Sequence, residues 1–224
     1  MTRTIAVVTA GLTRPSSTRL LADQLAAAAV KRLDPVESDS VEVVTVEVVT
    51  VEVVTVEVVT IEVRDIAHDL VNNLLTGFPA PELKAALDAV AGADGVIAVT
   101  PTFNASYNGL FKMFFDVLGD AALVDKPVLI AATGGTVRHS LALEHALRPM
   151  FAHLRAVVAP TSVFAAPEDW AGADGGSAGG AGGSLRVRID RAAAELADLI
   201  GSRKPAVAPD PFALTTTFDD LLAG

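Results

Sequence analysis

The sequence predicts an α/β fold in which a doubly wound, five-stranded parallel sheet carries helices on both faces. The first observation is that short apolar runs alternate with longer helical patterns through most of the chain. The second is that these runs are almost wholly apolar, which is typical of strands buried on both faces of a parallel sheet. The third is that polar or glycine-rich loops follow three of the runs, where open α/β sheets bind their ligands.

Each apolar run has the length of a strand, and each intervening segment has helical periodicity. We expect strands at residues 4–9, in part of 41–63, and at 95–100, 127–133 and 156–164. We expect helices at residues 17–33, 66–75, 81–91, 108–118, 139–154 and 185–200. The third strand is expected to end at Pro101, because proline has no N–H group and a fixed φ angle.

Residues 1–203 are expected to form one domain, followed by a C-terminal tail at residues 204–224. The hydrophobic fraction of 51% is ample for the core of one large domain. Residues 171–184 contain seven glycines and few side chains that could pack, so they are expected to form a surface loop.

A tandem repeat occupies the region of the second strand. The sequence Val-Glu-Val-Val-Thr occurs four times in residues 41–60, and a degenerate fifth copy follows at residues 61–65. One copy would suffice for a strand. Because side chains alternate with period two, a shift by one five-residue copy turns each valine to the opposite face, and the register is weakly specified. We interpret the tract as an expanded second strand without a function of its own; an assembly ribbon is the alternative.

The composition excludes several partners and sites. Lys and Arg number 17 against 27 Asp and Glu, so the net charge is −10, and no basic cluster suits a nucleic acid. There is no cysteine, which excludes disulfides, thiolate metal sites and a cysteine nucleophile. No long stretch is apolar and uncharged, and the N-terminal apolar run is too short for a signal peptide. We therefore expect a soluble cytoplasmic protein that does not bind membranes.

The loop after the first strand suits a phosphate group. It reads Ala-Gly-Leu-Thr-Arg-Pro-Ser-Ser-Thr-Arg over residues 10–19 and leads into a helix. The hydroxyl groups of Ser16, Ser17 and Thr18 coincide with the free N–H groups and the positive dipole end of that helix, which favour an anion. The alternative is that one serine only caps the helix.

Two further loops are expected at the same edge of the sheet. Residues 101–109 offer side-chain amides and a hydroxyl group at Asn104, Ser106 and Asn108, which can grip a planar polar ring. Residues 133–136 read Thr-Gly-Gly-Thr, and consecutive glycines let the backbone approach a ligand closely, although a simple turn would also favour glycine. Because all three loops follow parallel strands, we expect them to open on the carboxyl edge together.

Other chemical signals are weaker. His139, His145 and His153 are spaced by six and eight residues, which does not match the i, i+4 pair of a helical metal site, so no metal site is expected. Lys112 and Asp116 are expected to form an exposed i, i+4 pair. No carboxylate pair and no order of Ser, His and Asp points to a hydrolase, and no side chain is assigned a catalytic role.

The three loops resemble those of the NAD(P)H-dependent FMN reductases, a family of the flavodoxin-like superfamily. In that family a Ser/Arg-rich first loop holds the FMN phosphate, a motif similar to Pro-Glu-Tyr-Asn-Gly-Ser follows the third strand, and a Gly-Gly loop follows the fourth. The resemblance covers about residues 3–165, apart from the repeat, and the stretch 138–149 is similar to an actinobacterial branch. It implies a flavodoxin-like sheet with the strand order 2-1-3-4-5.

The resemblance also implies which residues bind the flavin. Those that would hold the phosphate are Arg14, Ser16, Ser17 and Thr18. Those that would lie against the isoalloxazine ring are Pro101, Thr102, Phe103, Asn104, Ala105, Ser106, Thr133, Gly134, Gly135 and Thr136. This chain has Thr102 and Phe103 where the family more often has Glu-Tyr, and Ala105 where it has glycine.

By this resemblance the chain would reduce FMN with NADPH or NADH, by hydride transfer from the nicotinamide to flavin N5. A homodimer or homotetramer is implied, as is a flavin-dependent monooxygenase that receives the reduced FMN. One alternative is a quinone, azo or chromate reductase that keeps its flavin bound. Another is an electron carrier of the same fold without nicotinamide turnover, since fold alone does not define function.

Overall fold

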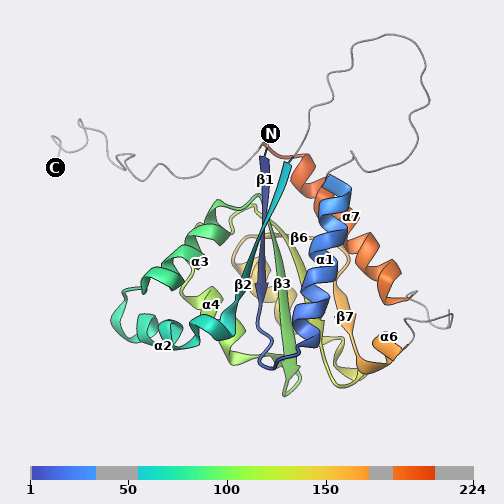
Figure 1. Ribbon diagram of the computed structural model, residues 1–224, viewed down its shortest axis with the longest axis horizontal. Helices are drawn as coiled ribbons and strands as arrows, with labels where there is room; N and C mark the ends of the chain where they lie inside the picture. Colours follow the sequence, from blue (N-terminus) through green and yellow to red (C-terminus); the bar gives the residue numbers. More distant parts are fainter. Residues whose placement is uncertain (1, 34–54, 172–183, 205–224) are drawn as a thin grey trace, which may run out of the picture.

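The computed structural model describes residues 2–33, 55–171 and 184–204, which form a mainly parallel sheet between two layers of helices (Figure 1). The strands are β1 Thr2–Thr9, β2 Thr55–Glu62, β3 Gly95–Phe103, β4 Ser106–Tyr107, β5 Pro127–Thr133, β6 Val157–Val158 and β7 Val163–Ala165. The α-helices are α1 Ser17–Leu33, α2 Ala67–Thr76, α3 Pro81–Gly92, α4 Gly109–Asp116, α5 Arg148–His153, α6 Pro167–Ala171 and α7 Leu185–Gly201. Three further turns are η2 Val63–Ile66 and η3 Val137–His139, both 3-10 helical, and η4 Leu143–Leu147, which is π-helical.

The sheet has seven strands, so the expectation of exactly five strands is wrong. The order is β2-β1-β3-β5-β6, while β4 pairs with β3 and β7 pairs with β5. Two features account for the difference. A short antiparallel strand, β4, follows β3, and the expected fifth strand at residues 156–164 is divided into β6 and β7.

The segment between β6 and β7 is held by side chains. Glu195 of α7 accepts hydrogen bonds from the backbone N–H and the hydroxyl group of Thr161 at 2.6 and 2.8 Å. Arg148 donates to the carbonyl oxygens of Ala159 and Pro160 at 3.2 and 3.1 Å. These bonds take up backbone groups that a continuous strand would have used, and the strand is therefore interrupted.

The expected helix at residues 139–154 is likewise divided, into η3, η4 and α5. Pro149 lies in the first turn of α5, where its missing N–H group is tolerated, but it cannot continue an α-helical ladder from the preceding turn. The residues before it adopt the wider π pattern. The expected pair of Lys112 and Asp116 is confirmed on the exposed face of α4.

Alternate residues of the central strands face two separate apolar layers. In β1, Ile5 and Val7 pack with α1 and α7, whereas Ala6 and Val8 pack with α2, α3, α4 and α5. Figure 1 shows α1 and α7 on one side of the sheet and α2 to α4 on the other. Every residue of β5 is buried, as expected for a strand covered on both faces.

The helix α1 begins at Ser17 and ends at Leu33, as predicted. Its first turn is capped by Ser16, whose hydroxyl oxygen accepts a hydrogen bond from the Arg19 N–H at 3.2 Å. Leu21 and Leu25 recur four residues apart and are fully buried against the sheet. The helix N-terminus is thereby fixed at the carboxyl edge.

The strand β2 contains the fourth copy of the repeat, residues 56–60, and the start of the degenerate copy. Residues 41–54 of the repeat, residues 172–183 of the glycine-rich stretch and residues 205–224 of the tail lie outside the described residues. Within the described ranges, no helix is long and apolar enough to cross a membrane.

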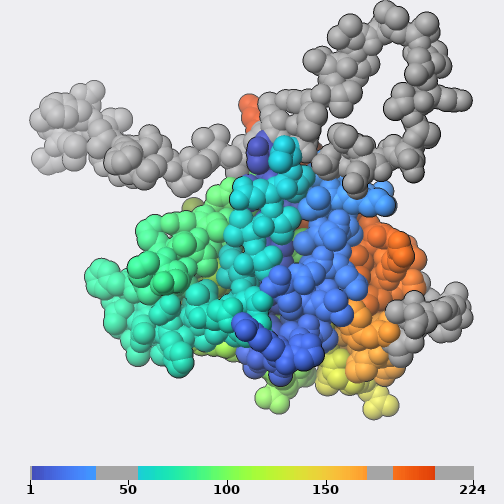
Figure 2. Space-filling model, viewed as in Figure 1, coloured from blue at the N-terminus to red at the C-terminus, as the bar shows by residue number. Residues whose placement is uncertain are grey.

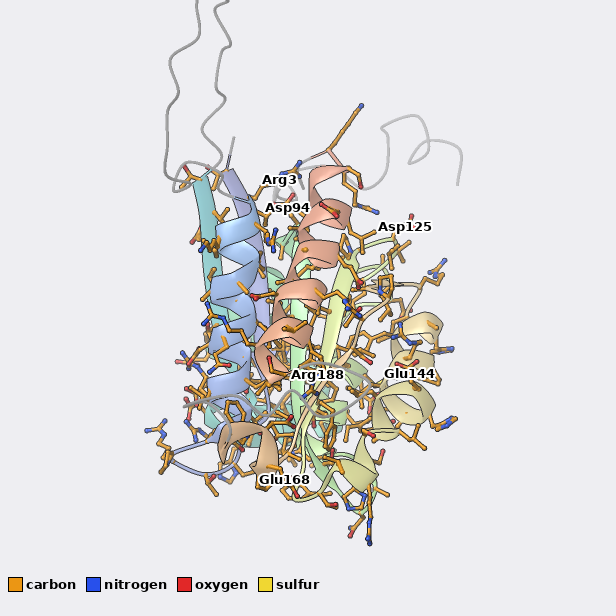
Figure 3. All side chains as sticks on the ribbon, turned by 90° about the vertical axis from the view of Figure 1, so that its right-hand side faces the viewer. Arg3, Asp94, Asp125, Glu144, Glu168 and Arg188 are labelled. Carbon is orange, nitrogen blue, oxygen red and sulfur yellow. The ribbon has the colours of Figure 1, made fainter. Side chains whose placement is uncertain are left out.

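Buried charged residues close the amino edge of the sheet. Arg3 forms an ion pair with Asp94 at 3.0 Å, and the two side chains are only 11% and 6% exposed (Figure 3). The Lys126 ammonium group donates to the carbonyl oxygens of Val90 and Ala91, at the end of α3, at 2.7 and 2.6 Å. Burial lowers the pKa of Lys126 from 10.5 to about 8, although the Asp94 carboxylate opposes this shift.

We expect Lys126→Met to lower the free energy of unfolding by about 1–3 kcal/mol at neutral pH, because two carbonyl groups lose their donor. The unfolded chain keeps the Lys126 proton up to about 10.5, whereas the folded chain releases it near 8, so the wild type gains stability as the pH rises through this window. Urea unfolding of both proteins between pH 7 and 10 measures this. An advantage of the wild type that is constant or shrinks above pH 8 would contradict the assignment.

Candidate functional site

The structure brings the three predicted loops together at the carboxyl edge. The hydroxyl groups of Thr18 in α1 and Thr133 at the end of β5 are hydrogen-bonded at 2.8 Å, and both residues are buried. The side-chain amide of Asn108 donates to the Ala10 carbonyl oxygen at 3.2 Å, which joins the loop after β3 to the loop after β1. These buried contacts hold the loops as one surface.

The first loop, residues 10–16, packs tightly against the start of α1. A Cβ atom at Gly11 would lie 2.0 Å from Ser16 Oγ, so only glycine fits there while Ser16 keeps its position. The capping role considered for Ser16 is observed, and Thr18 uses its hydroxyl group inside the protein. Ser17 is exposed in the first turn of α1, where backbone N–H groups have no partner within the helix and can bind an anion.

Charged side chains surround the first loop. Arg14 pairs with Asp65 at 3.3 Å, and the side chains are 73% and 56% exposed. Arg19 pairs with Glu62 at 2.5 Å and with Asp23 at 2.7 Å, and the hydrogen bond with Asp23 is the main reason that the pKa of Arg19 is raised. An exposed pair such as that of Arg14 contributes little, so its charge can turn to a bound anion at small cost.

The loop after β3 is a hairpin, and the expectation that the strand ends at Pro101 is wrong. The strand continues through Pro101, which lies opposite Thr133 of β5, and ends at Phe103. Phe103 in turn lies opposite Ser106 of β4. The antiparallel pairing with β4 supplies backbone hydrogen bonds beyond the proline, and these extend the strand.

The hairpin turn consists of Asn104 and Ala105, both exposed, with φ angles of 50° and 64°. Positive φ at both central residues is what a two-residue type I′ turn requires. Asparagine adopts this conformation readily, whereas alanine is strained in it. The turn is therefore built with a residue that its backbone disfavours.

The side chains of this hairpin have different roles. Thr102 Oγ1 is buried and has no hydrogen-bond partner among the described residues, and Phe103 is 48% exposed. Asn108 is buried, and its side-chain oxygen accepts a hydrogen bond from the Phe111 N–H at 2.7 Å. Because both ends of its amide are used within the protein, the expectation that Asn108 grips a ligand ring is wrong.

The two glycines after β5 differ in their surroundings. The Gly134 N–H donates to the Ala165 carbonyl oxygen at 3.1 Å, and a Cβ atom at Gly134 would lie 2.7 Å from Phe164 Cζ. Gly135 is exposed, and a Cβ atom there would meet no described atom within 4 Å. Thr136 Oγ1 accepts a hydrogen bond from the Arg138 N–H at 3.4 Å. Packing thus explains Gly134, while Gly135 leaves open backbone at the edge.

Two residues of this edge were not predicted. Thr9, at the end of β1, is only 2% exposed, and its hydroxyl oxygen has no hydrogen-bond partner among the described residues. Arg64 donates to the Thr13 carbonyl oxygen at 2.7 Å and so contacts the first loop directly. The sequence contains a signal for each of them. Thr9 is a hydroxyl residue at the end of an apolar strand, and Arg64 is the first arginine to interrupt the repeat.

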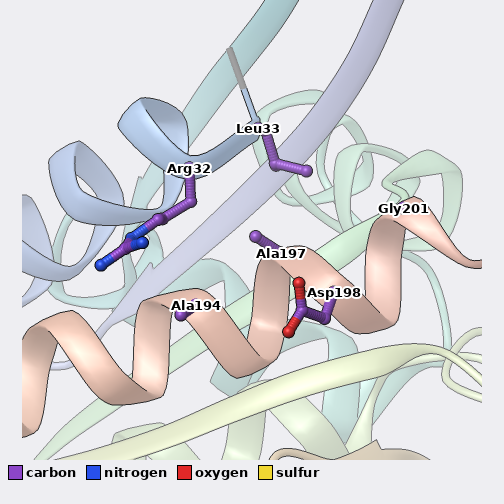
Figure 4. Close-up of a pocket in the computed structure, with 6 residues that line it drawn as sticks. All are labelled: Arg32, Leu33, Ala194, Ala197, Asp198 and Gly201. Carbon is purple, nitrogen blue, oxygen red and sulfur yellow. The ribbon is translucent and has the colours of Figure 1, made fainter. Parts of the chain in front are cut away.

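A hollow of about 570 Å³ lies elsewhere, between the C-terminal ends of α1 and α7 (Figure 4). Its lining residues are Arg32, Leu33, Ala194, Ala197, Asp198 and Gly201. None of them belongs to the three loops, and the ends of these helices lie at the amino edge of the sheet. The hollow is therefore not part of the candidate site.

The strained turn makes a prediction about stability. Ala105→Gly is expected to raise the free energy of unfolding by about 0.5–1 kcal/mol, because glycine removes the left-handed strain at the cost of some chain entropy. Ala85→Gly, at an exposed position inside α3, is the matched control and should lower it by about 1 kcal/mol. Urea unfolding measures both changes, and equal signs for the two variants would contradict the strained turn.

Comparison with known proteins identifies the family. The family model of NADPH-dependent FMN reductases matches residues 3–171. An FMN reductase (NADPH) of Pseudomonas aeruginosa is 40% identical over 139 residues, which cover 62% of this chain and 72% of the relative. An NADH-dependent FMN reductase, SfnF, of Pseudomonas fluorescens is 41% identical over 138 residues, covering 62% and 71%.

Solved structures agree with this match. An oxidoreductase from Corynebacterium diphtheriae superposes with a TM-score of 0.75 and 41% identity, and the match covers 91% of this chain and 99% of the other. The family match spans all three loops that the structure joins at the carboxyl edge. This chain therefore belongs to the family of NADPH-dependent FMN reductases.

Proposed function

We propose that this chain reduces FMN with NADPH or NADH and binds the flavin at the carboxyl edge of its sheet. The observation that carries the proposal is that three loops matched by the family model are joined there by buried hydrogen bonds. The names of the relatives favour FMN reduction over the quinone, azo or chromate reductase and over the electron carrier. Both nicotinamide nucleotides occur in those names.

The residues present at this edge fit a flavin. The buried hydroxyl groups of Thr9 and Thr102, which have no hydrogen-bond partner within the described part of the chain, indicate that a polar ligand completes the site. The open backbone at Gly135 allows a planar ring to approach closely. The free N–H groups at the start of α1, where Ser17 is exposed, and the Arg14 guanidinium group offer the donors and the positive charge that a phosphate needs.

The protein would act mainly by positioning its two substrates. The N–H groups of Ser17 and Thr18 would hold the phosphate, together with the Arg14 side chain. Phe103 and Asn104 on the hairpin, and Gly135 opposite, would form the walls beside the ring. Bound FMN would supply the acceptor for the nicotinamide hydride, so no side-chain acid or base is assigned. Holding two rings in contact accounts for the rate by raising their effective concentration.

A turnover assay tests the proposal. Purified protein mixed with FMN and either NADPH or NADH should consume the reduced nicotinamide, as followed by its near-ultraviolet absorbance. Parallel reactions with FAD, riboflavin and a quinone define the acceptor. Absence of nicotinamide oxidation with every flavin would overturn the proposed function, whereas turnover with quinone alone would favour the alternative reductase.

Substitutions at Gly134 and Gly135 distinguish an effect on FMN binding from an effect on packing within the protein. Gly135→Ala is expected to weaken FMN binding about tenfold without a change in thermal stability, because its methyl group meets no described atom and intrudes only on the ligand. Gly134→Ala should lower the free energy of unfolding by about 1–3 kcal/mol, since its methyl group collides with Phe164. Flavin fluorescence titration and thermal melts measure the two effects.

Gly92→Ala, at the end of α3, is the control for Gly135→Ala, because a Cβ atom there also meets nothing within 4 Å and lies outside the three loops. It should leave FMN binding unchanged. Unaltered binding in Gly135→Ala as well would contradict the placement of the flavin against this loop.

We also propose a homodimer or homotetramer that supplies reduced FMN to a flavin-dependent monooxygenase in the cytoplasm. Exposed apolar side chains on α2 and the turn after it support assembly: Val71, Leu74, Leu75 and Phe78 are 43%, 49%, 81% and 80% exposed. The absence of cysteine and the use of NAD(P)H support the location. Light scattering and a coupled monooxygenase assay test the assembly and the transfer; a monomer would contradict the first.

A further inference from the structure

The end of β2 is bonded to the first loop through Arg64. This guanidinium group donates to the Thr13 carbonyl oxygen at 2.7 Å and pairs with the Glu62 carboxylate. Its side chain is only 15% exposed and its pairing with Glu62 is partly buried, whereas Thr13 lies at the surface. Figure 2 shows the first loop, in dark blue, beside the teal residues that follow β2. Segments about fifty residues apart in the sequence are thus joined at the candidate phosphate site.

The Glu62 carboxylate also binds α1. It accepts a hydrogen bond from Arg19 at 2.5 Å, while its other oxygen pairs with Arg64. Glu62 is 20% exposed at its side chain, and both of its oxygens are used. One carboxylate therefore connects the end of β2 to the first turn of α1, whose N–H groups face the proposed phosphate.

The Thr13 carbonyl oxygen fixes the shape of the loop between β1 and α1. The Thr13 hydroxyl group also donates to the Pro15 carbonyl oxygen at 3.0 Å, so the turn is held from inside and from β2. The turn leads into Ser16, which caps the helix, and into Ser17, which is exposed. A change at Thr13 would be carried into the residues that are proposed to bind the phosphate.

We propose that Arg64 is a positioning residue for the flavin phosphate, acting through the Thr13 carbonyl oxygen and Glu62. The inference rests on the proposed function. The planar fork of arginine reaches a carbonyl and a carboxylate at once, which the single ammonium group of lysine does not reproduce. The two terminal nitrogens of Arg64 are used within the protein, by the Thr13 carbonyl oxygen and by Glu62. Its buried Nε has no hydrogen-bond partner among the described residues and lies 3.6 Å from the Asp65 carboxylate. Arg64 therefore shapes the loop through its terminal nitrogens, and the contact with the phosphate is assigned to other groups.

The test compares FMN with riboflavin, which has the same ring and lacks the phosphate. Arg64→Met is expected to raise the Kd of FMN about tenfold and that of riboflavin less than twofold, because only the phosphate loop is disturbed. Arg64→Lys should recover little of the loss. Arg191→Met, which removes an exposed arginine of α7, is the matched control and should bind both flavins as the wild type does.

Kinetics give a second readout. Arg64→Met should raise the KM for FMN and leave kcat at saturating flavin near the wild-type value, because the reacting rings are unaffected. Should Arg64→Met fail to fold, Arg64→Lys serves for the same measurements. Unchanged FMN binding, or equal losses for FMN and riboflavin, would overturn the inference. Failure of the wild type to bind or reduce any flavin would instead overturn the proposed function.

Discussion

The geometry of the carboxyl edge depends on one buried side chain, the amide of Asn108. Its oxygen caps α4 through the Phe111 N–H, and its nitrogen donates to the Ala10 carbonyl at the end of β1. Its own backbone N–H donates to the hydroxyl group of Thr100. A single residue thus accepts a hydrogen bond from the first turn of α4 and joins the ends of β1 and β3. Loss of either bond would leave buried polar groups without partners, which is costly.

Around this amide, some residues of the carboxyl edge are bonded or packed within the protein, and others are exposed. Thr18 and Thr133 bond to each other, and Gly134 packs against Phe164, so these residues form the frame. Ser17 at the start of α1, the hairpin turn and Gly135 are exposed. A frame whose polar groups are satisfied internally keeps its shape when the ligand leaves. This is the condition for a site that binds a substrate and releases it in every turnover.

Much of this arrangement follows from sequence patterns. The apolar runs and the helical periodicity predicted α1 to the residue and placed the three loops after their strands. The hairpin after Pro101 could not be predicted, since its turn uses Ala105 where the backbone favours glycine. The interruption between β6 and β7 depends on Glu195 and Arg148, which are distant in sequence from the residues they hold. Periodicity describes local preference and carries no record of such tertiary contacts.

The role of Arg64 could not be predicted from the sequence either. It follows a repeat that does not specify the register of β2, so the sequence did not show which residues it would lie beside. If β2 were offset by one copy, Val56 would occupy the place of Ile61, and most other positions of the strand would receive a residue of the same kind. Each valine would then face the opposite side of the sheet, but the valine from the preceding copy would take its former position. The exchange of Ile61 for valine in the core would cost only about 0.5–1.5 kcal/mol.

What distinguishes the observed register is the degenerate copy that ends the repeat. In an offset strand Val59 would lie where Arg64 lies, and the bond to the Thr13 carbonyl oxygen and the pairing with Glu62 would both be lost. Both contacts are charge-assisted and the pairing with Glu62 is partly buried, so their loss outweighs the small change in the core. The same arginine that shapes the first loop therefore selects the register of β2, and a functional site can tolerate a repetitive strand because its last residues are not repetitive.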